Sequence, residues 1–180
     1  MSVQRLPYMV VFEEDTGFKD VYGGALGMVA VEAMRITPET KSDTAIVFSH
    51  PVGGGSFLPM VNALAHGGHH VIYANTRYRG NDIALLMEKC VNDLGAVIAH
   101  AKEKFGYKKI VLGGWSGGGS LSLFYQDQAT GKRLTQTAAG DPYDLSKAEL
   151  PAADAVLLLA AHVSRAVTLT EWIDPSISDE

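Results

Sequence analysis

Residues 109–120 read KIVLGGWSGGGS, and this stretch decides the fold of the chain. Its first half is a short apolar run typical of a buried strand, and the mostly apolar residues 121–125 that follow favour a helix. At the bend between them, Ser116 stands in the frame G-x-S-x-G, with Gly114 and Gly118 on either side. This is the nucleophile-elbow pattern, in which a strained serine needs small neighbours where strand and helix come close. The stretch therefore predicts a strand, a tight turn that carries Ser116, and a helix.

The glycines of the chain do not fit the two common phosphate-binding loops. No G-x-G-x-x-G spacing occurs, and the only Gly-Lys pair, Gly131-Lys132, is followed by Arg133 instead of serine or threonine. A helix that starts at Gly117 would instead direct its free N–H groups and positive dipole end at Ser116, where negative charge develops during acyl transfer. The sequence therefore favours acyl-transfer chemistry over phosphate binding.

The composition is that of one globular domain. The chain has 180 residues, of which 47% are hydrophobic and 19% charged, and its net charge of −5 argues against a nucleic-acid-binding surface. Its one cysteine, Cys90, excludes an intrachain disulfide and is expected in the core. The N-terminus lacks the apolar run of a signal peptide, and no stretch reaches the roughly 20 apolar residues of a membrane span. We therefore expect a cytoplasmic protein.

Strand and helix patterns alternate along the chain. Strands are predicted at residues 8–13, 28–36, 44–49, 69–75 and 155–160, in addition to the strand before Ser116. Helices are predicted at about 57–66, capped by Ser56, and at about 83–105, capped by Asn81 or Asp82 and ended by Gly106. A polar connection is expected over 126–152, and a further helix over 163–173.

This alternation predicts an α/β fold: a mainly parallel, twisted sheet with helices on both faces, preceded by a β-hairpin within residues 1–43. Ligands of such sheets bind at the carboxyl ends of the strands. Ser116, the loop 50–55, Arg77 and His162 all follow the carboxyl ends of predicted strands, so we expect them to meet at one edge of the sheet.

Taken with the elbow, the loop 50–55 gives the chain a resemblance to the α/β-hydrolase superfamily over about residues 44–162. This loop reads HPVGGG after a buried strand and is similar to the His-Gly motif of esterases and lipases. The resemblance implies a serine hydrolase that acts on a small-molecule carboxylic ester or related acyl compound, with Ser116 as nucleophile and without a cofactor. A metal site at His69 and His70 is not expected, because neighbouring side chains on a strand point to opposite faces.

The resemblance also implies an oxyanion site built from backbone N–H groups. The first is that of Gly117, the residue after the nucleophile. Pro51 stands where the family has a glycine and has no N–H, so Val52 is the expected second donor, with Gly53 behind it. Four residues are expected to line the active site: His50, Gly53, Trp115 and His162.

The catalytic base is the main gap. The family order of serine, acid and then histidine implies that the usual acid and base lie beyond residue 180, so weak or no turnover is expected of this chain. His162 follows the strand next after the elbow, and we favour a structural or substrate-facing role for it. The chain is interpreted as a single hydrolase domain that is C-terminally incomplete, with residues 163–180 as the start of a cap.

Two further expectations follow from this interpretation. Without outer neighbours, the strand 155–160 would leave an apolar sheet edge that favours self-association. The alternative function is that of a catalytically incomplete domain that binds a ligand or partner through the same cleft.

Overall fold

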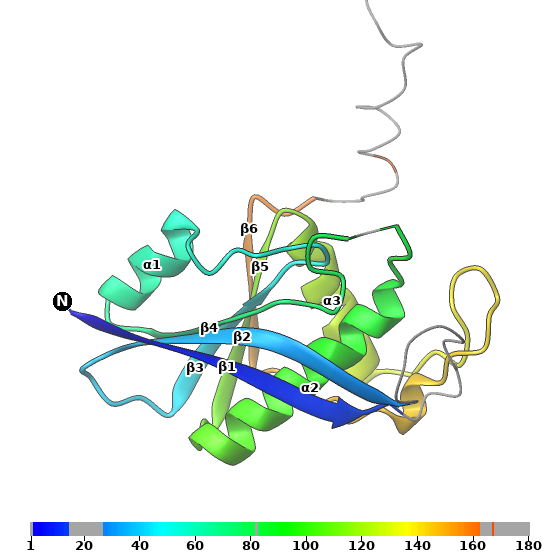
Figure 1. The fold of residues 1–180 in the computed structure, drawn as a ribbon, viewed down its shortest axis with the longest axis horizontal. Coiled ribbons are helices and arrows are strands. Elements are labelled where there is room, and N and C mark those ends of the chain that lie inside the picture. The colour runs from blue at the N-terminus through cyan, green and yellow to red at the C-terminus, as the bar shows by residue number, and fades with distance from the viewer. Residues whose placement is uncertain (1, 15–26, 82, 163–166, 168–180) are drawn as a thin grey trace, which may run out of the picture.

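The protein is built on one six-stranded sheet with the strand order β1-β2-β4-β3-β5-β6 (Figure 1). The computed structural model describes residues 2–14, 27–81, 83–162 and 167. The first two strands, β1 (Val3–Glu13) and β2 (Met28–Pro38), form an antiparallel pair along their whole length. β2 in turn runs antiparallel to β4 (His70–Ala74).

The other half of the sheet is parallel. β3 (Thr44–Ser49) lies between β4 and β5 (Lys109–Trp115), and β6 (Ala155–Leu159) follows β5. All four strands therefore present their carboxyl ends at the same edge of the sheet. The predicted mainly parallel α/β architecture is confirmed.

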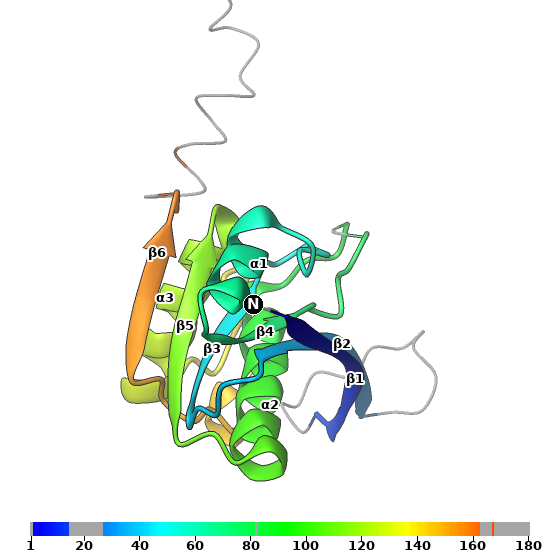
Figure 2. The same ribbon diagram turned by 90° about the vertical axis from the view of Figure 1, so that its left-hand side faces the viewer.

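Helices cover both faces of the sheet (Figure 2). The short helix α1 (Pro59–His66) packs on one face through Val61 and Ala65. The longer helices α2 (Met87–Phe105) and α3 (Gly117–Thr130) pack on the other, and a 3₁₀ turn, η1 (Leu145–Lys147), follows them. The two faces thus have separate hydrophobic cores, and burial of their apolar side chains is the main force that holds the layers together.

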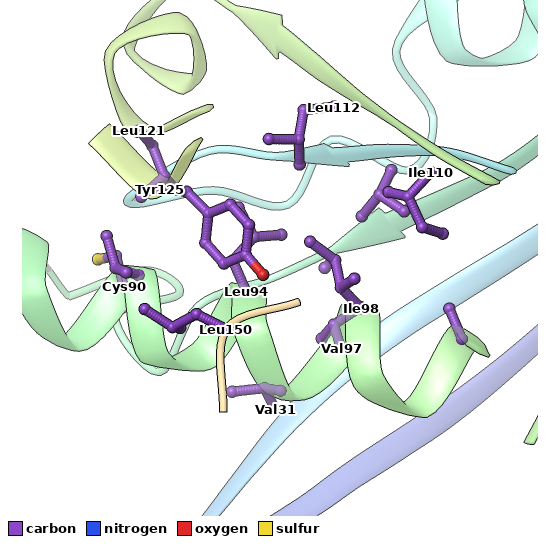
Figure 3. Close-up of a cluster of buried hydrophobic side chains, with 14 of the residues drawn as sticks. Val31, Cys90, Leu94, Val97, Ile98, Ile110, Leu112, Leu121, Tyr125 and Leu150 are labelled. Atoms are coloured by element: carbon purple, nitrogen blue, oxygen red, sulfur yellow. The ribbon is translucent and has the colours of Figure 1, made fainter. Parts of the chain in front are cut away.

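The larger core lies between the sheet and the helices α2 and α3 (Figure 3). Leu94 and Ile98 of α2 meet Tyr125 of α3 beneath Ile110 and Leu112 of the sheet, and all five are nearly inaccessible to solvent. The buried Tyr125 hydroxyl donates a hydrogen bond to the Pro151 carbonyl at 2.7 Å, so the polar group of this buried side chain has a partner. This core fixes α3, and with it the turn that precedes α3.

The predicted limits of the strands hold best where the strand is buried. β3 occupies the predicted residues 44–49, because its continuous apolar run is buried on both faces. β1 begins at Val3, five residues before the predicted start. Pro7 and the polar residues around it weaken the strand pattern, but β1 is an edge strand, where a proline is tolerated because one side needs no ladder hydrogen bonds.

Two predicted helix starts are wrong. α1 begins at Pro59, and Ser56 does not cap it: the N-cap residue is Leu58, without a side-chain hydrogen bond. The proline itself fits the first turn, where no N–H is needed. α2 begins at Met87, because the Asn81 side chain accepts a hydrogen bond from the Ile83 N–H at 3.3 Å in a turn that precedes the helix.

The ends of the helices also differ from the prediction in part. Gly106 ends α2 as predicted, in the left-handed conformation with φ 74°. α3 continues to Thr130, into the stretch predicted as a polar connection. Three predictions fall outside the described residues: the helix cap at Asp82, the helix over 163–173 and the start of a cap segment at 163–180. Val167 is the one residue of 163–180 that the structure describes.

The two edges of the sheet are β1 and β6. Within the described residues β6 pairs with β5 alone, and its Leu158 side chain is 45% exposed. No helix in this part of the chain is both long and apolar enough to cross a membrane.

Candidate active site

Ser116 stands at the tight turn between β5 and α3, as the elbow pattern predicts. Its backbone has φ 53° and ψ −127°, a conformation that is costly for a residue with a side chain. The Ser116 N–H donates to the Leu159 carbonyl of β6 at 3.4 Å, and the Ser116 carbonyl accepts from the Gly119 N–H at 3.0 Å. The strain is therefore held by the neighbouring strand and by the first turn of α3.

The glycines around Ser116 are explained by close packing of backbone on backbone. A Cβ atom at Gly118 would lie 2.2 Å from the Ser49 carbonyl oxygen at the end of β3. One at Gly114 would lie 2.5 Å from the Gly119 Cα atom in the first turn of α3. Both distances are impossible for real atoms, so only glycine lets the strand and helix approach in this way.

His162 lies beside the candidate nucleophile. Its Nε2 atom lies 3.4 Å from Ser116 Oγ, and its backbone N–H lies 3.5 Å from the Ser116 carbonyl oxygen. The Ser116 and His162 residues are both half-buried, so both remain reachable from solvent. The sequence favoured a structural or substrate-facing role for this histidine, and the structure places it in contact with the serine.

His50 lies next to Gly117, the residue after Ser116. Its Nδ1 atom accepts a hydrogen bond from the Val52 N–H at 3.4 Å. Its Nε2 atom is the nearest side-chain atom to Gly117, 3.1 Å from where a Cβ would be. Its ring also faces that of Trp115, with 6.0 Å between the centroids. The loop that carries Val52 is therefore next to the start of α3.

Two carbonyl groups of the loop 50–55 accept hydrogen bonds from side chains of β4 and of the residues that follow it. Thr76 Oγ1 donates to the Pro51 carbonyl at 2.5 Å, and the Tyr73 hydroxyl donates to the Gly53 carbonyl at 3.1 Å. In a planar trans peptide the C=O and the following N–H point in opposite directions. Holding the Pro51 carbonyl against Thr76 therefore turns the Val52 N–H away from β4.

Neither Thr76 nor Tyr73 was predicted from the sequence as part of the site. Thr76 is 2% exposed and Tyr73 3% exposed, and both belong to β4 or the residues directly after it. Burial raises the pKa of Tyr73 to about 12, so its hydroxyl stays protonated and available as a donor at neutral pH. The sequence did contain a signal for Thr76: it is a polar residue two positions after a buried strand whose carboxyl end lies at the same edge of the sheet.

Arg77, in contrast, does not join the predicted site. Its guanidinium group is bound by two carboxylates, with 2.7 Å between Nη1 and Glu14 Oε2 and 2.6 Å between Nη2 and Asp93 Oδ1. Asp93 is fully buried on α2, and Glu14 also accepts from the Tyr143 hydroxyl at 2.5 Å. We call Glu14, Arg77, Asp93 and Tyr143 the Arg77 cluster. It links four distant parts of the chain.

The described residues contain no group of three or more histidine, cysteine, aspartate or glutamate side chains placed to hold a metal ion.

Comparison with known proteins identifies the fold. No family model matches the chain, and no curated protein matches it. A hormone-sensitive lipase from a metagenome library is 18% identical with a TM-score of 0.50, over 81% of this chain and 45% of that chain. A putative hydrolase from Agrobacterium vitis S4 is 12% identical with a TM-score of 0.50, over 98% of this chain and 59% of that chain. The chain thus has the α/β-hydrolase fold and spans about half the length of these two structures.

Proposed function

We propose that the protein is a serine hydrolase that acts on carboxylic esters or related acyl compounds, with Ser116 as the nucleophile. The observation that carries this proposal is the strained conformation of Ser116 between β5 and α3, with a histidine nitrogen 3.4 Å from its hydroxyl oxygen. A serine hydroxyl becomes a useful nucleophile only when a neighbouring base can take its proton. Ser116 is half-buried, so part of the residue remains exposed to solvent.

The oxyanion is proposed to bind between the N–H groups of Gly117 and Val52. Gly117 is the first residue of α3, where the N–H groups have no partner within the helix and the dipole favours negative charge. The Val52 N–H meets His50 Nδ1 at 3.4 Å, which is long for a hydrogen bond. An oxyanion is a stronger acceptor than a neutral imidazole, so it would take over this donor.

The test is covalent modification of Ser116 by a fluorophosphonate, which transfers its phosphorus to activated serines. We expect one label per chain by intact-mass measurement, located at Ser116 by peptide mapping and lost in Ser116→Ala. The matched control is Ser120→Ala, one turn further along α3, which should be labelled like the wild type. Labelling that is absent or located elsewhere would contradict the proposal and favour the alternative of a domain that only binds its ligand.

A smaller effect on the labelling of Ser116 is expected when the loop 50–55 loses the hydrogen bond between Thr76 and the Pro51 carbonyl. Thr76→Val keeps the shape of the side chain but removes the donor to the Pro51 carbonyl, so the Val52 N–H is held less firmly. One hydrogen bond contributes about 0.5–1.5 kcal/mol net, so labelling of Ser116 should slow by up to about tenfold. The control is Thr130→Val at the far end of α3, whose hydroxyl donates to the Gln126 carbonyl of its own helix. Equal labelling rates in both variants would show that the hydrogen bond between Thr76 and the Pro51 carbonyl does not affect the reactivity of Ser116.

A further inference from the structure

β1 forms the edge of the sheet opposite β6 (Figure 2). Among the described residues it pairs with β2 alone, so alternate N–H and C=O groups along its other side have no strand to bind. Edge strands are usually protected by proline, by charged side chains or by a bulge. Residues 8–12 carry neither proline nor a charge, and their register with β2 is unbroken. This part of β1 is therefore open to a further strand.

An open cavity of about 330 Å³ lies beside this part of β1. It is lined by residues 10–13, by one side of α2 and by the segment 147–149. The residues that α2 contributes include Ala96 and Ala99, whose small side chains leave space between the helix and the strand. Side chains of a strand alternate between its two faces, so a strand added to β1 would direct every second side chain into this cavity.

The other face of β1 offers exposed apolar side chains. Val10 and Phe12 pack toward α2, so Met9 and Val11, which alternate with them, lie on the opposite face. Met9 is 50% exposed and Val11 is 58% exposed. The remaining side chains of an added strand would cover these two residues. An extended peptide thus finds apolar contacts on both of its faces and main-chain hydrogen bonds along one edge.

The charges around the cavity favour a basic peptide. Three exposed glutamates line it, Glu13, Glu103 and Glu149, and within the described part of the chain none of them forms an ion pair. Two lysines, Lys104 and Lys147, also line it, and the whole chain has a net charge of −5. Negative charge therefore exceeds positive charge, so a cationic occupant is complementary, whereas a second copy of the chain would bring further negative charge.

We propose that the β1 groove, defined as this cavity together with the open side of residues 8–13, binds an extended basic peptide segment of a partner protein. The peptide adds to the sheet as a further strand beside β1. Its main-chain hydrogen bonds supply affinity, and its alternate side chains in the cavity supply selectivity. No residue of the candidate active site takes part, so the inference does not depend on the proposed function.

The probe is the acetylated and amidated peptide KVTVKVTVK, whose β-branched residues favour an extended chain. It is added to ¹⁵N-labelled wild-type protein, and the amide resonances are followed by NMR. We expect resonances of residues 8–13 and of the groove side of α2 to shift, and the outward N–H groups of β1 to exchange more slowly with solvent. The same peptide with glutamate in place of lysine should bind about tenfold more weakly, and this difference should shrink as salt is added.

Two N-methylated forms of the probe test whether it binds as a strand. Methyl groups on alternate nitrogen atoms block one edge of the extended peptide in the first form and the other edge in the second. The form that is blocked toward β1 should lose at least about tenfold in affinity, because several main-chain hydrogen bonds are lost. The other form should bind like the unmodified peptide. Equal binding of the two forms would overturn the proposal.

A change in the protein tests the cavity. Ala96→Gln places a longer side chain in the cavity and should weaken binding of the probe by about tenfold, because peptide side chains meet the added atoms. The matched control is Ala63→Gln, an exposed position on α1 at the other face of the sheet, which should bind like the wild type. Unchanged resonances at residues 8–13, or unchanged affinity in Ala96→Gln, would contradict the proposal. Resonances of β1 that depend on protein concentration without peptide would assign the groove to a second copy and also overturn it.

Discussion

Replacing Asp93 with alanine should lower the free energy of unfolding by about 3–5 kcal/mol, the cost of breaking a buried ion pair by removing one partner. Asp93 is fully buried, and its two carboxylate oxygens accept hydrogen bonds from the Arg77 backbone N–H at 2.9 Å and from Nη2 at 2.6 Å. Burial raises the pKa of Asp93, and the charge of Arg77 offsets this only in part. Without Asp93, the guanidinium group would keep Glu14 as its one carboxylate partner in the Arg77 cluster.

The measurement is urea unfolding followed by circular dichroism, with the wild type and Asp93→Ala compared at one pH. Since whole domains are stable by about 5–15 kcal/mol, the variant should lose a large part of its stability. Glu103→Ala is the control, because Glu103 is exposed on the same helix and such changes stay within about 0.5 kcal/mol. A loss of less than 1 kcal/mol in Asp93→Ala, near the ordinary value for a surface change, would mean that the Arg77 cluster does not stabilise the fold.

Gly118→Ala should damage both stability and reactivity. The new Cβ would lie 2.2 Å from the Ser49 carbonyl oxygen, a backbone atom inside the sheet, so α3 must move away from β3. Overpacking of this kind costs about 1–3 kcal/mol. The movement also shifts the Gly117 N–H from its place beside Ser116, and a displacement of about 1 Å at a reacting site can cost about 10²-fold in rate.

Both effects can be measured on one preparation. Thermal unfolding gives the loss of stability, and fluorophosphonate labelling at a temperature where the variant remains folded gives the loss of rate. Ser120→Ala, in the next turn of α3, serves as the control, and should change neither quantity. A variant that loses stability but labels at the wild-type rate would show that the start of α3 does not determine the reactivity of Ser116.

The elbow region could be predicted because its sequence leaves few alternatives. The continuous apolar run of β3 is short and typical of a buried strand, and Gly114 and Gly118 stand where backbone approaches backbone. The contact between His162 and Ser116 could not be derived in this way. It depends on the conformation of Ala160, and a left-handed alanine has no signature in a sequence.

The Arg77 cluster shows a signal that the sequence did contain. Asp93 falls on the apolar stripe of α2, three residues after Cys90 and four before Val97, so a carboxylate was placed in the core. A buried charge requires a partner. That this partner is Arg77 could not be predicted, because Arg77 follows a different element and meets Asp93 only through the tertiary fold.

The separation of these residues along the chain also has a consequence for synthesis on the ribosome. Glu14 is made early, and its partners follow it along the chain: Arg77 after 63 residues, Asn92 after 78 and Tyr143 after 129. A domain generally folds as one unit, so the hydrogen bonds of the Glu14 carboxylate can be complete only after residue 143 has been made. A nascent chain that has not yet released residue 143 lacks one of the hydrogen bonds to the Glu14 carboxylate. The Arg77 cluster therefore marks a point in translation before which the native fold is incomplete.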